Sequence, residues 1–596
     1  HPYTLPIGRI ADFIKDMSKP DEEGGSLAVV VPPEIEEQLD EIATSMPGQS
    51  RDITQQLGNM QSFFTARKEP LQPWQLDGAR FLAEKCNALL ADEQGLGKTI
   101  EAAVALDVTS PVIIVCPTVV MINWYRELVK WRPDRDPSKI FIHNPTGKKI
   151  AIDHAEDGSS IYIDQEKSPL GQVTKKWHWP KEGETFITAY SRLMKDPVKS
   201  EIKKRGLVTP HTILIADEAQ KVKGKFKTAR ASGEADDEQD EEGSELADDP
   251  TASMVGGVKV AGTKSSYRFQ VISDMVRYKG GCVWILTGTP LSNEGDELWR
   301  IFSRGGMEHD VFGDWGNFVR WMSPEQGKRG RGGKAAKYDW KETHPNTHAL
   351  VPALRKKMLR REKIDQLDIP PKQYVTIDVE ISPDDLQRVD EIGITEEDFQ
   401  AIQGRGGGGG ISDAMLEKIA ERQQEFDEDD IALFAESQGG GVAFAKIAKA
   451  RAILARAKIP ALNRFISEQF EAKNEPVVVF SSHNAPLEAL VMDAQIRARQ
   501  RGEKQAKKWG IILGSTSMAQ RQRAVDAFQA GQLDGLAVSI RAGGAGLTLT
   551  KSANSVFVDR DWNPANNQQA EDRIHRMGQK RQAVITFIRA NHHIDY

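Results

Sequence analysis

The fold is decided by the stretch Leu89-Leu90-Ala91-Asp92-Glu93-Gln94-Gly95-Leu96-Gly97-Lys98-Thr99-Ile100-Glu101. Its apolar start, Gly-x-Gly turn and helix-forming end predict a strand, a phosphate-binding loop and a helix. Gly95 and Gly97 let backbone N–H groups converge on phosphate oxygens, and the helix N-terminus adds the positive end of its dipole. We expect Lys98 to reach the β and γ phosphates of a nucleotide and the Thr99 hydroxyl to bind Mg²⁺.

The loop departs from the common phosphate-loop pattern at one position. That pattern has a glycine five residues before Gly97, where this sequence has Asp92. The alternative interpretation is a glycine-rich turn that carries one surface lysine. The motifs that follow the loop favour the nucleotide site.

Composition limits the class of protein. A chain of 596 residues exceeds what one hydrophobic core organises, so we expect two or more domains. A net charge of -7 gives no overall sign of nucleic-acid binding, although a local basic groove is compatible with it. Because no apolar run approaches a membrane span and the first residues lack a signal-peptide core, we expect an intracellular protein with no membrane partner. The chain begins at His1 rather than Met, which indicates a missing native start.

The cysteines are few and far apart. Cys86, Cys116 and Cys282 show neither a disulfide framework nor the spacing of a zinc site. We therefore expect buried free thiols and no zinc.

A second apolar run ends in two carboxylates. His211 to Ala216 reads as a buried strand, and Asp217, Glu218 and Gln220 follow at the edge where open α/β sheets bind ligands. We expect Asp217 to hold Mg²⁺ through water, and Glu218 to orient and deprotonate the attacking water. The alternative is a strand followed by an acidic turn.

Further strands and polar turns complete the pattern. After the strand that begins at Cys282, the hydroxyls of Thr287 and Thr289 are placed to relay the state of the γ-phosphate to a neighbouring lobe. Strands alternating with helices in the second half predict a second parallel sheet. There, Arg573 and Arg576 lie at i and i+3, which predicts one helical face that reaches the γ-phosphate from the other lobe. An ordinary turn and a basic helix face are the alternatives.

These blocks, in this order, resemble the Swi/Snf family of superfamily two helicase-type ATPases. The resemblance covers residues from about 70 to 595, and the blocks that carry it are DEQGLGKT, DEAQ, LTGTPLSN, GLTLT and DWNPANNQQAEDRIHRMGQ. It implies a DNA translocase with ATP and Mg²⁺ as ligands. Met358 to Lys363 and Pro370 to Lys372 are similar to the family's link between its two lobes.

The resemblance also implies roles for individual residues. Gln75 looks like the residue that reads adenine, and Arg573 with Arg576 like paired arginine fingers. Coupling between the lobes is implied for Gln220, which stands where His is usual, and for Thr287, Thr289 and Gly546. Thr548 replaces a common Asn, a variation that resembles the annealing-helicase branch.

The fold class implied is α/β, with two RecA-like lobes and helical protrusions. We expect an accessory region at 1–69, lobe 1 at 70–368 and lobe 2 at 369–596. Lobe 1 would carry an acidic loop at 233–250 and a protrusion at about 300–354, and lobe 2 a glycine-rich and helical insertion at about 382–441.

Two sets of residues are candidates for contact with DNA. Ser515, Thr516 and Arg521 resemble the family's Gly-Ser-Thr motif on the nucleic-acid face of the second lobe. Lys328, Arg329 and Arg331 lie in a basic glycine-rich loop that suits phosphate contact, with a solvated linker as the alternative. A hypothesis for the acidic run at 234–242 is competition with DNA phosphates, and an inert loop is the alternative.

The function expected is ATP-dependent translocation on duplex or forked DNA, which serves fork remodelling, annealing or displacement of bound proteins. The alternatives are a strand-separating DNA or RNA helicase and a scaffold that binds nucleotide without hydrolysing it. A monomer in the cytoplasm of a bacterial or phage-infected cell is favoured over a nuclear protein, because the chain is compact and lacks long tails.

Overall fold

The computed structural model describes residues 71–154, 160–165, 168–193, 208–222, 225–227, 254–255, 258–261, 264–291, 294–325, 338–395, 397–398, 442–500, 508–543, 547–562 and 564–595. Several predictions lie outside these residues. They concern the accessory region, the acidic run, the glycine-rich stretch at 404–410, Gly546 and the basic loop with Lys328, Arg329 and Arg331.

Lobe 1 is built on an eight-stranded sheet in which every neighbouring pair is parallel. In sheet order its strands are β15 (Met358–Leu359), β1 (Asn87–Leu90), β12 (Cys282–Leu286), β8 (Ile213–Asp217), β2 (Val112–Cys116), β7 (Thr185–Ala189), β3 (Ile140–His143) and β6 (Gln172–Thr174). The central strands are apolar and buried along their length, as parallel strands covered on both faces are.

Helices cover both faces of this sheet, and alternate residues of its strands pack into a separate hydrophobic core on each face. Leu89 and Ile113 belong to one core, whereas Leu90 and Ile114 belong to the other. The longer helices of the lobe are α4 (Pro73–Glu84), α5 (Lys98–Ala105), α6 (Met121–Trp131) and α9 (Lys264–Tyr278), and the short ones are η1 (Thr118–Val120), η2 (Pro137–Lys139), α7 (Tyr190–Leu193) and η4 (Ala219–Val222).

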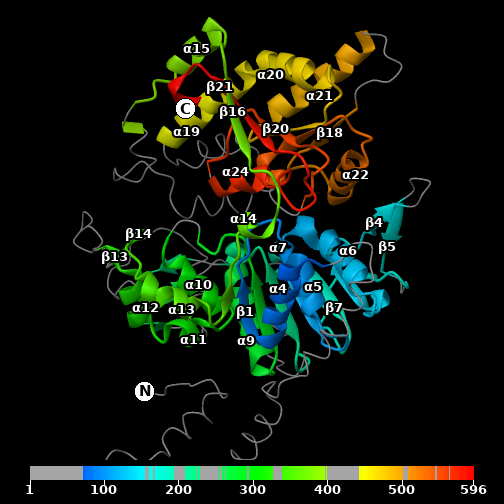
Figure 1. Cartoon of the computed structure of the whole chain (residues 1–596), viewed down its shortest axis with the longest axis vertical. Coiled ribbons are helices and arrows are strands. Elements are labelled where there is room, and N and C mark those ends of the chain that lie inside the picture. The colour runs from blue at the N-terminus through cyan, green and yellow to red at the C-terminus, as the bar shows by residue number, and fades with distance from the viewer. Residues whose placement is uncertain are drawn as a thin grey trace, which may run out of the picture.

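A helical unit packs at one end of lobe 1 (Figure 1). Its core is aromatic, with Trp299 stacked on Phe312 at 5.6 Å and Phe318 stacked on Trp340 at 5.6 Å between ring centroids. The unit contains α10 (Glu297–Arg304), α11 (Glu308–Phe312), α12 (Trp315–Met322), β13 (Pro324–Glu325), β14 (Asp339–Thr343) and α13 (Thr347–Leu354). It overlaps the range of the expected protrusion.

Two small antiparallel elements also belong to lobe 1. One is the hairpin of β4 (Ile150–His154) and β5 (Ser160–Ile163), and the other contains β9 (Lys225–Lys227), β10 (Met254–Val255) and β11 (Val258–Ala261). The first hairpin lies beside lobe 2 (Figure 1), where the Arg523 guanidinium donates to the Tyr162 hydroxyl at 3.4 Å.

Lobe 2 is a second parallel sheet, which the alternating pattern of the sequence predicts. In sheet order its strands are β16 (Gln373–Val379), β21 (Val584–Ala590), β20 (Asn554–Phe557), β17 (Val477–Ser481), β19 (Gly535–Ser539) and β18 (Trp509–Ile512). Its helices are α15 (Pro383–Asp390), α19 (Val442–Ala457), α20 (Ile459–Ile466), η6 (Ser467–Glu471), α21 (Asn484–Gln500), α22 (Met518–Gln529), α23 (Ile540–Gly543), α24 (Pro564–Glu571) and η7 (His593–Asp595).

The two lobes face each other and are joined by one link (Figure 1). The link begins inside lobe 1, since β15 extends the sheet beside β1, and it continues through α14 (Lys363–Gln366) to β16. A second contact joins α6 to α22, where Arg126 lies 3.3 Å from Asp526. The prediction of two α/β lobes is confirmed. Among the described helices, none has the length and apolar character needed to cross a membrane.

Candidate nucleotide site

The phosphate loop connects β1 to α5 at the carboxyl edge of the lobe 1 sheet. Gly95 and Gly97 have φ angles of 93° and 103°, a left-handed conformation that glycine adopts without strain. The Lys98 ammonium folds back and donates to the carbonyls of Asp92 at 2.6 Å and Glu93 at 3.4 Å. Thr99 follows as the second residue of α5. The strand, loop and helix therefore stand where the sequence places them.

Asp92, the departure from the usual loop pattern, is fully buried and has a partner in the link. Its carboxylate accepts from the Arg361 backbone N–H and Nε, each at 2.9 Å, and pairs with Arg361 Nη2. The same guanidinium lies 2.7 Å from Glu101, which is also fully buried. Burial raises the pKa of Glu101 well above its usual range and the Asp92 charge adds to this, whereas Arg361 opposes it. The acid at the position of the usual glycine is thus accommodated because it forms a buried ion pair with Arg361.

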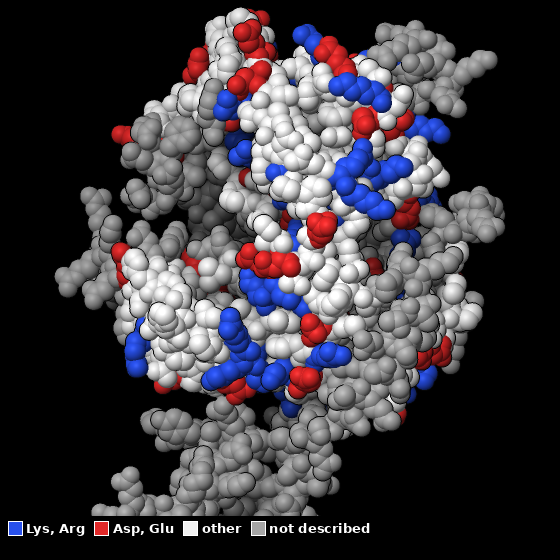
Figure 2. Space-filling view, viewed as in Figure 1, with Lys and Arg blue, Asp and Glu red and all other residues white. Residues whose placement is uncertain are grey.

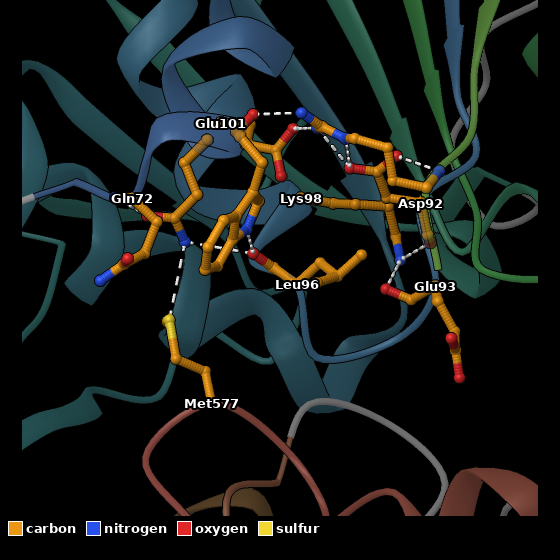
Figure 3. A network of polar contacts seen from close by, with 10 residues as sticks. Gln72, Asp92, Glu93, Leu96, Lys98, Glu101 and Met577 are labelled. Atoms are coloured by element: carbon orange, nitrogen blue, oxygen red, sulfur yellow. Dashed lines mark hydrogen bonds and ion pairs between the residues drawn. The ribbon is translucent and has the colours of Figure 1, made fainter. Parts of the chain in front are cut away.

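Gln75 lies beneath the loop and is buried. Its amide nitrogen donates to the Leu96 carbonyl at 3.1 Å, and its oxygen accepts from the Gln72 N–H at 3.1 Å in a capping box that opens α4. The Trp74 indole also donates to the Leu96 carbonyl, at 3.2 Å. Figure 3 shows this network, with Met577 of lobe 2 approaching it and Lys98 turned toward Asp92 and Glu93. The structure therefore gives Gln75 a definite task, which is to support the loop backbone.

Asp217 and Glu218 stand at the end of β8. Asp217 Oδ2 accepts from the Trp124 indole at 2.7 Å, and Oδ1 accepts from the Glu218 N–H at 3.0 Å. Burial, followed by the Glu218 charge, raises the pKa of Asp217 to about 7. Glu218 has a φ of 54°, a strained conformation for a non-glycine residue that is concentrated at functional sites. The two neighbouring carboxylates have different side-chain partners, since Asp217 accepts from Trp124 and Glu218 accepts from Gln220.

A chain of hydrogen bonds joins this carboxylate pair to the turn after β12. Gln220 Nε2 donates to Glu218 at 2.7 Å, and the Thr287 hydroxyl donates to Gln220 Oε1 at 2.8 Å. The Thr289 N–H donates in turn to the Thr287 hydroxyl at 3.1 Å. The structure thus brings together three of the residues for which coupling is predicted.

Lobe 2 contributes the segment with the two arginines, but not as a helix face. The helix α24 ends at Glu571, so the prediction that Arg573 and Arg576 share one helical face is wrong. They lie in a turn that is held from outside, since the Leu549 N–H donates to the Arg573 carbonyl at 3.0 Å. Arg576 donates to the Leu547 carbonyl at 2.9 Å and to the Thr548 hydroxyl at 3.0 Å.

The arginine turn meets the phosphate loop across the junction of the lobes. A Cβ added at Gly95 would lie only 3.0 Å from the Cβ of Arg576, so the loop approaches this turn closely. Burial and the neighbouring Arg576 lower the pKa of Arg573 to about 10, and the Glu218 carboxylate of lobe 1 opposes that shift. Phosphate loop, carboxylates and arginines therefore converge on one place.

The predicted DNA contacts of lobe 2 fall into two kinds. Ser515 is exposed at the tip of the loop after β18, and Thr516 accepts from the Leu513 N–H at 2.9 Å. Arg521 is buried and donates to the carbonyls of Ala542 at 3.0 Å and Leu513 at 3.2 Å. That position suits bracing of the loop rather than presentation of a guanidinium to a phosphate.

Sequence reasoning missed the part that the link plays in the site. Arg361 and Lys363 were recognised only as members of a family motif, yet they contact Asp92 and Glu93 of the phosphate loop. The available signal was the unusual acid at position 92, which needs a cation when buried.

This chain is similar to known proteins along most of its length. A model of the SNF2-related domain matches residues 41–234 and 259–431, more than half of the chain, and a model of the helicase conserved C-terminal domain matches 457–578. The chain is 25% identical over 542 residues to Protein CHROMATIN REMODELING 5 of Arabidopsis thaliana, which covers 87% of this chain and 25% of that protein. It is 23% identical over 529 residues to the ISWI chromatin-remodeling complex ATPase ISW1 of Saccharomyces cerevisiae, which covers 86% and 38%.

The chain therefore spans only about a quarter to two-fifths of the length of these curated relatives. A solved structure, the Sulfolobus solfataricus SWI2/SNF2 ATPase core in complex with dsDNA, is 18% identical, with a TM-score of 0.31 over 88% of each chain. The prediction of a cytoplasmic over a nuclear location is contradicted, because curated relatives of this chain are eukaryotic proteins named for chromatin remodelling.

Proposed function

The chain belongs to the SNF2-related family, and on this premise we propose that it is an ATP-driven motor that moves along double-stranded DNA. One observation carries the proposal. Arg573 and Arg576 of lobe 2 meet the phosphate loop and the carboxylates of lobe 1 at the junction between the lobes. A site divided in this way is completed by closure of the lobes, so hydrolysis and lobe movement are linked.

The side chains of lobe 1 suit binding of ATP with Mg²⁺. The carboxylate of Asp217 and the hydroxyl of Thr99 are hard oxygen ligands of the kind that Mg²⁺ prefers. Asp217 is buried beside a second carboxylate, and a cation at this point relieves both charges. Bound Mg²⁺ would neutralise charge on the β and γ phosphates. The ammonium of Lys98 would exchange its two loop carbonyls for phosphate oxygens, and Gln75 would keep the loop in shape from below, beside the adenine that it is predicted to read.

Hydrolysis then needs a base and a stabilised transition state. Glu218 orients and deprotonates the attacking water, and its strained backbone fixes the direction of its carboxylate. Arg573 and Arg576 stabilise charge that develops on the transferred group, a contribution worth about 10³ to 10⁵ in turnover in related phosphoryl-transfer enzymes. The bonds from Glu218 through Gln220 to Thr287 carry the state of the site to the turn after β12.

Duplex DNA is the proposed track. Support comes from two curated relatives whose names describe chromatin remodelling. The exposed Ser515 with Thr516 is the proposed contact of lobe 2, and backbone phosphates are the proposed target.

Steady-state ATPase activity tests the proposal. It is measured without nucleic acid and with duplex DNA, forked DNA, single-stranded DNA and RNA. We expect strong stimulation by duplex or forked DNA, which Lys98→Ala abolishes. Stimulation by RNA or a single strand alone would instead support a strand-separating helicase, and a displaced strand in a duplex-unwinding assay would decide for that alternative.

A second variant separates an enzyme from a scaffold that only binds nucleotide. Glu218→Gln keeps the size of the side chain and removes its basicity. We expect it to lose turnover and retain ATP binding. Equal turnover in Glu218→Gln and wild-type protein would remove Glu218 from the mechanism.

A further inference from the structure

The first residues of the link are locked to the phosphate loop by backbone bonds. Beyond the pairing of β15 with β1, the Ala91 N–H donates to the Leu359 carbonyl at 2.7 Å, and the Glu93 N–H donates to the Arg361 carbonyl at 2.9 Å. The link is therefore aligned residue by residue with the loop, and any movement of the loop reaches Lys363.

Lys363 contacts the phosphate loop on one side. Its N–H donates to Glu93 Oε2 at 2.8 Å, and its ammonium lies 3.9 Å from Glu93 Oε1. A Cβ at Gly95 would lie 3.3 Å from Lys363 Cε, so the stem of the lysine packs along the loop. The side chain is 5% exposed.

On its other side Lys363 contacts the arginine turn of lobe 2. The ammonium lies 2.7 Å from Asp572 Oδ1 and donates to the His575 carbonyl at 3.2 Å. Asp572 comes directly before Arg573, and His575 directly before Arg576. The turn that carries both arginines is thus folded around one ammonium group.

The charges at this junction alternate. Glu93, Lys363, Asp572, Lys372 and Glu571 form successive ion pairs, and Lys372 lies 3.0 Å from Asp572 and 2.8 Å from Glu571. Acidic and basic side chains both lie at the surface where the lobes meet (Figure 2). Burial lowers the pKa of Lys363, and the Asp572 carboxylate opposes this shift.

We propose that Lys363 is a positioning residue that fixes the arginine pair against the phosphate loop, and so sets the rate of ATP hydrolysis without touching the nucleotide. The inference rests on the proposed function. It identifies the physical connection by which the state of the loop reaches the arginines: the loop moves the link, and the ammonium carries the turn with it. Small displacements matter here, because a misplacement of about 1 Å costs on the order of 10²-fold in rate.

The test compares Lys363→Met with Lys372→Met. Both lysines pair with Asp572, but in the described part of the chain only Lys363 also contacts Glu93. We expect Lys363→Met to lower the kcat of DNA-stimulated hydrolysis about 10- to 100-fold and to leave the KM for ATP within about twofold. Lys372→Met is expected to keep most of the turnover.

A combined variant gives a readout that a merely structural role does not move. If Lys363 acts through the arginine pair, adding Lys363→Met to a variant that already carries both Arg573→Ala and Arg576→Ala lowers kcat no further. Multiplying losses would overturn the proposal, as would an unchanged kcat in Lys363→Met.

Asp572→Asn covers the case in which Lys363→Met fails to fold. It removes the charge partner and keeps the shape, so it must show the same selective loss of kcat. A normal kcat in this variant overturns the proposal. If the wild-type protein is active and Lys363→Met has the same kcat, the positioning role alone is refuted. If the wild-type protein is inactive with every nucleic acid, the proposed function is refuted, and the inference that rests on it is refuted as well.

Discussion

The Trp124 indole and the Asp217 carboxylate are joined by a buried hydrogen bond of 2.7 Å, which ties α6 to the end of β8. The Tyr190 hydroxyl holds the same residue from behind, because it donates to the Asp217 carbonyl at 2.8 Å. The proposed Mg²⁺ ligand is therefore oriented by two aromatic residues from two helices.

Trp124→Phe removes the donor and keeps an aromatic ring. Loss of a hydrogen bond to a charged group is expected to lower the free energy of unfolding by about 1.5 to 3 kcal/mol. It should also raise the half-saturating Mg²⁺ concentration in the ATPase assay. Trp131→Phe is the matched control, because on the same helix it loses a bond to Glu127 rather than to Asp217. Equal Mg²⁺ dependence in both variants would contradict the orienting role.

His143 predicts a pH dependence of stability. Burial, together with the Arg192 charge, lowers its pKa from 6.5 to about 4, and its Nδ1 lies 2.9 Å from the Thr188 hydroxyl. Below pH 6.5 the unfolded chain takes up a proton that the folded protein does not, so stability is complete above this pH and falls as the pH drops. By pH 5 the loss amounts to about 2 kcal/mol. In urea unfolding at pH 7.5 and pH 5, His143→Asn should lose this part of the pH dependence, and an unchanged difference would refute the assignment.

Arg361 is expected to be essential for the stability of lobe 1. Arg361→Met removes the cation that pairs with buried Asp92 and Glu101, and removing one partner of a buried pair costs about 3 to 5 kcal/mol. Denaturant unfolding measures the loss. The combined change Arg361→Met with Asp92→Gly should recover part of it, since it restores the usual loop glycine. A wild-type midpoint in Arg361→Met would show that water reaches the pair.

Thr287→Val is expected to weaken communication rather than hydrolysis itself. The substitution is nearly isosteric, but it removes the hydroxyl that donates to Gln220. We expect basal ATPase activity to remain and stimulation by duplex DNA to fall about fivefold, corresponding to about 1 kcal/mol of coupling. Thr212→Val is the control, because this buried hydroxyl donates to the Thr209 carbonyl away from the site. A full response to DNA in Thr287→Val would remove the hydroxyl from the coupling path.

Arg521→Met distinguishes a brace from a phosphate contact. If Arg521 only holds the loop after β18, its substitution should lower DNA affinity by the same factor at every salt concentration. Loss of one phosphate contact would instead make the plot of log K against log salt shallower by about 0.9. We expect the slope in Arg521→Met to equal that of the wild-type protein. Binding titrations over a range of salt concentrations measure it, and a shallower slope in the variant would show that Arg521 contacts a phosphate.

Much of this fold follows from local sequence. The apolar runs at β1, β8 and β12 were predicted as strands, because parallel strands covered on both faces leave a continuous hydrophobic signal. The phosphate loop was predicted because its closely spaced glycines indicate a tight turn with backbone conformations that other residues rarely adopt.

What the sequence did not reveal depends on contacts between distant residues. Asp92 and Arg361 are separated by 269 positions, so the sequence showed Asp92 only as a departure from the phosphate-loop pattern and did not reveal its partner. The arginine spacing of i and i+3 is a true helical signal. Tertiary bonds override it, because Lys363 and Leu549 capture the residues that follow Glu571.

The pairing of β15 with β1 has a consequence for how the protein can be divided. A fragment that ends at Leu354 would strip β1 of its neighbour and expose the amides of Leu89 and Ala91, which bond to Lys357 and Leu359. An exposed parallel edge of this kind invites pairing with other chains. Lobe 1 therefore does not end after the helical unit, and the chain cannot be divided there into two independent lobes. A hybrid motor that takes its second lobe from a relative should keep this chain's own residues as far as Leu367.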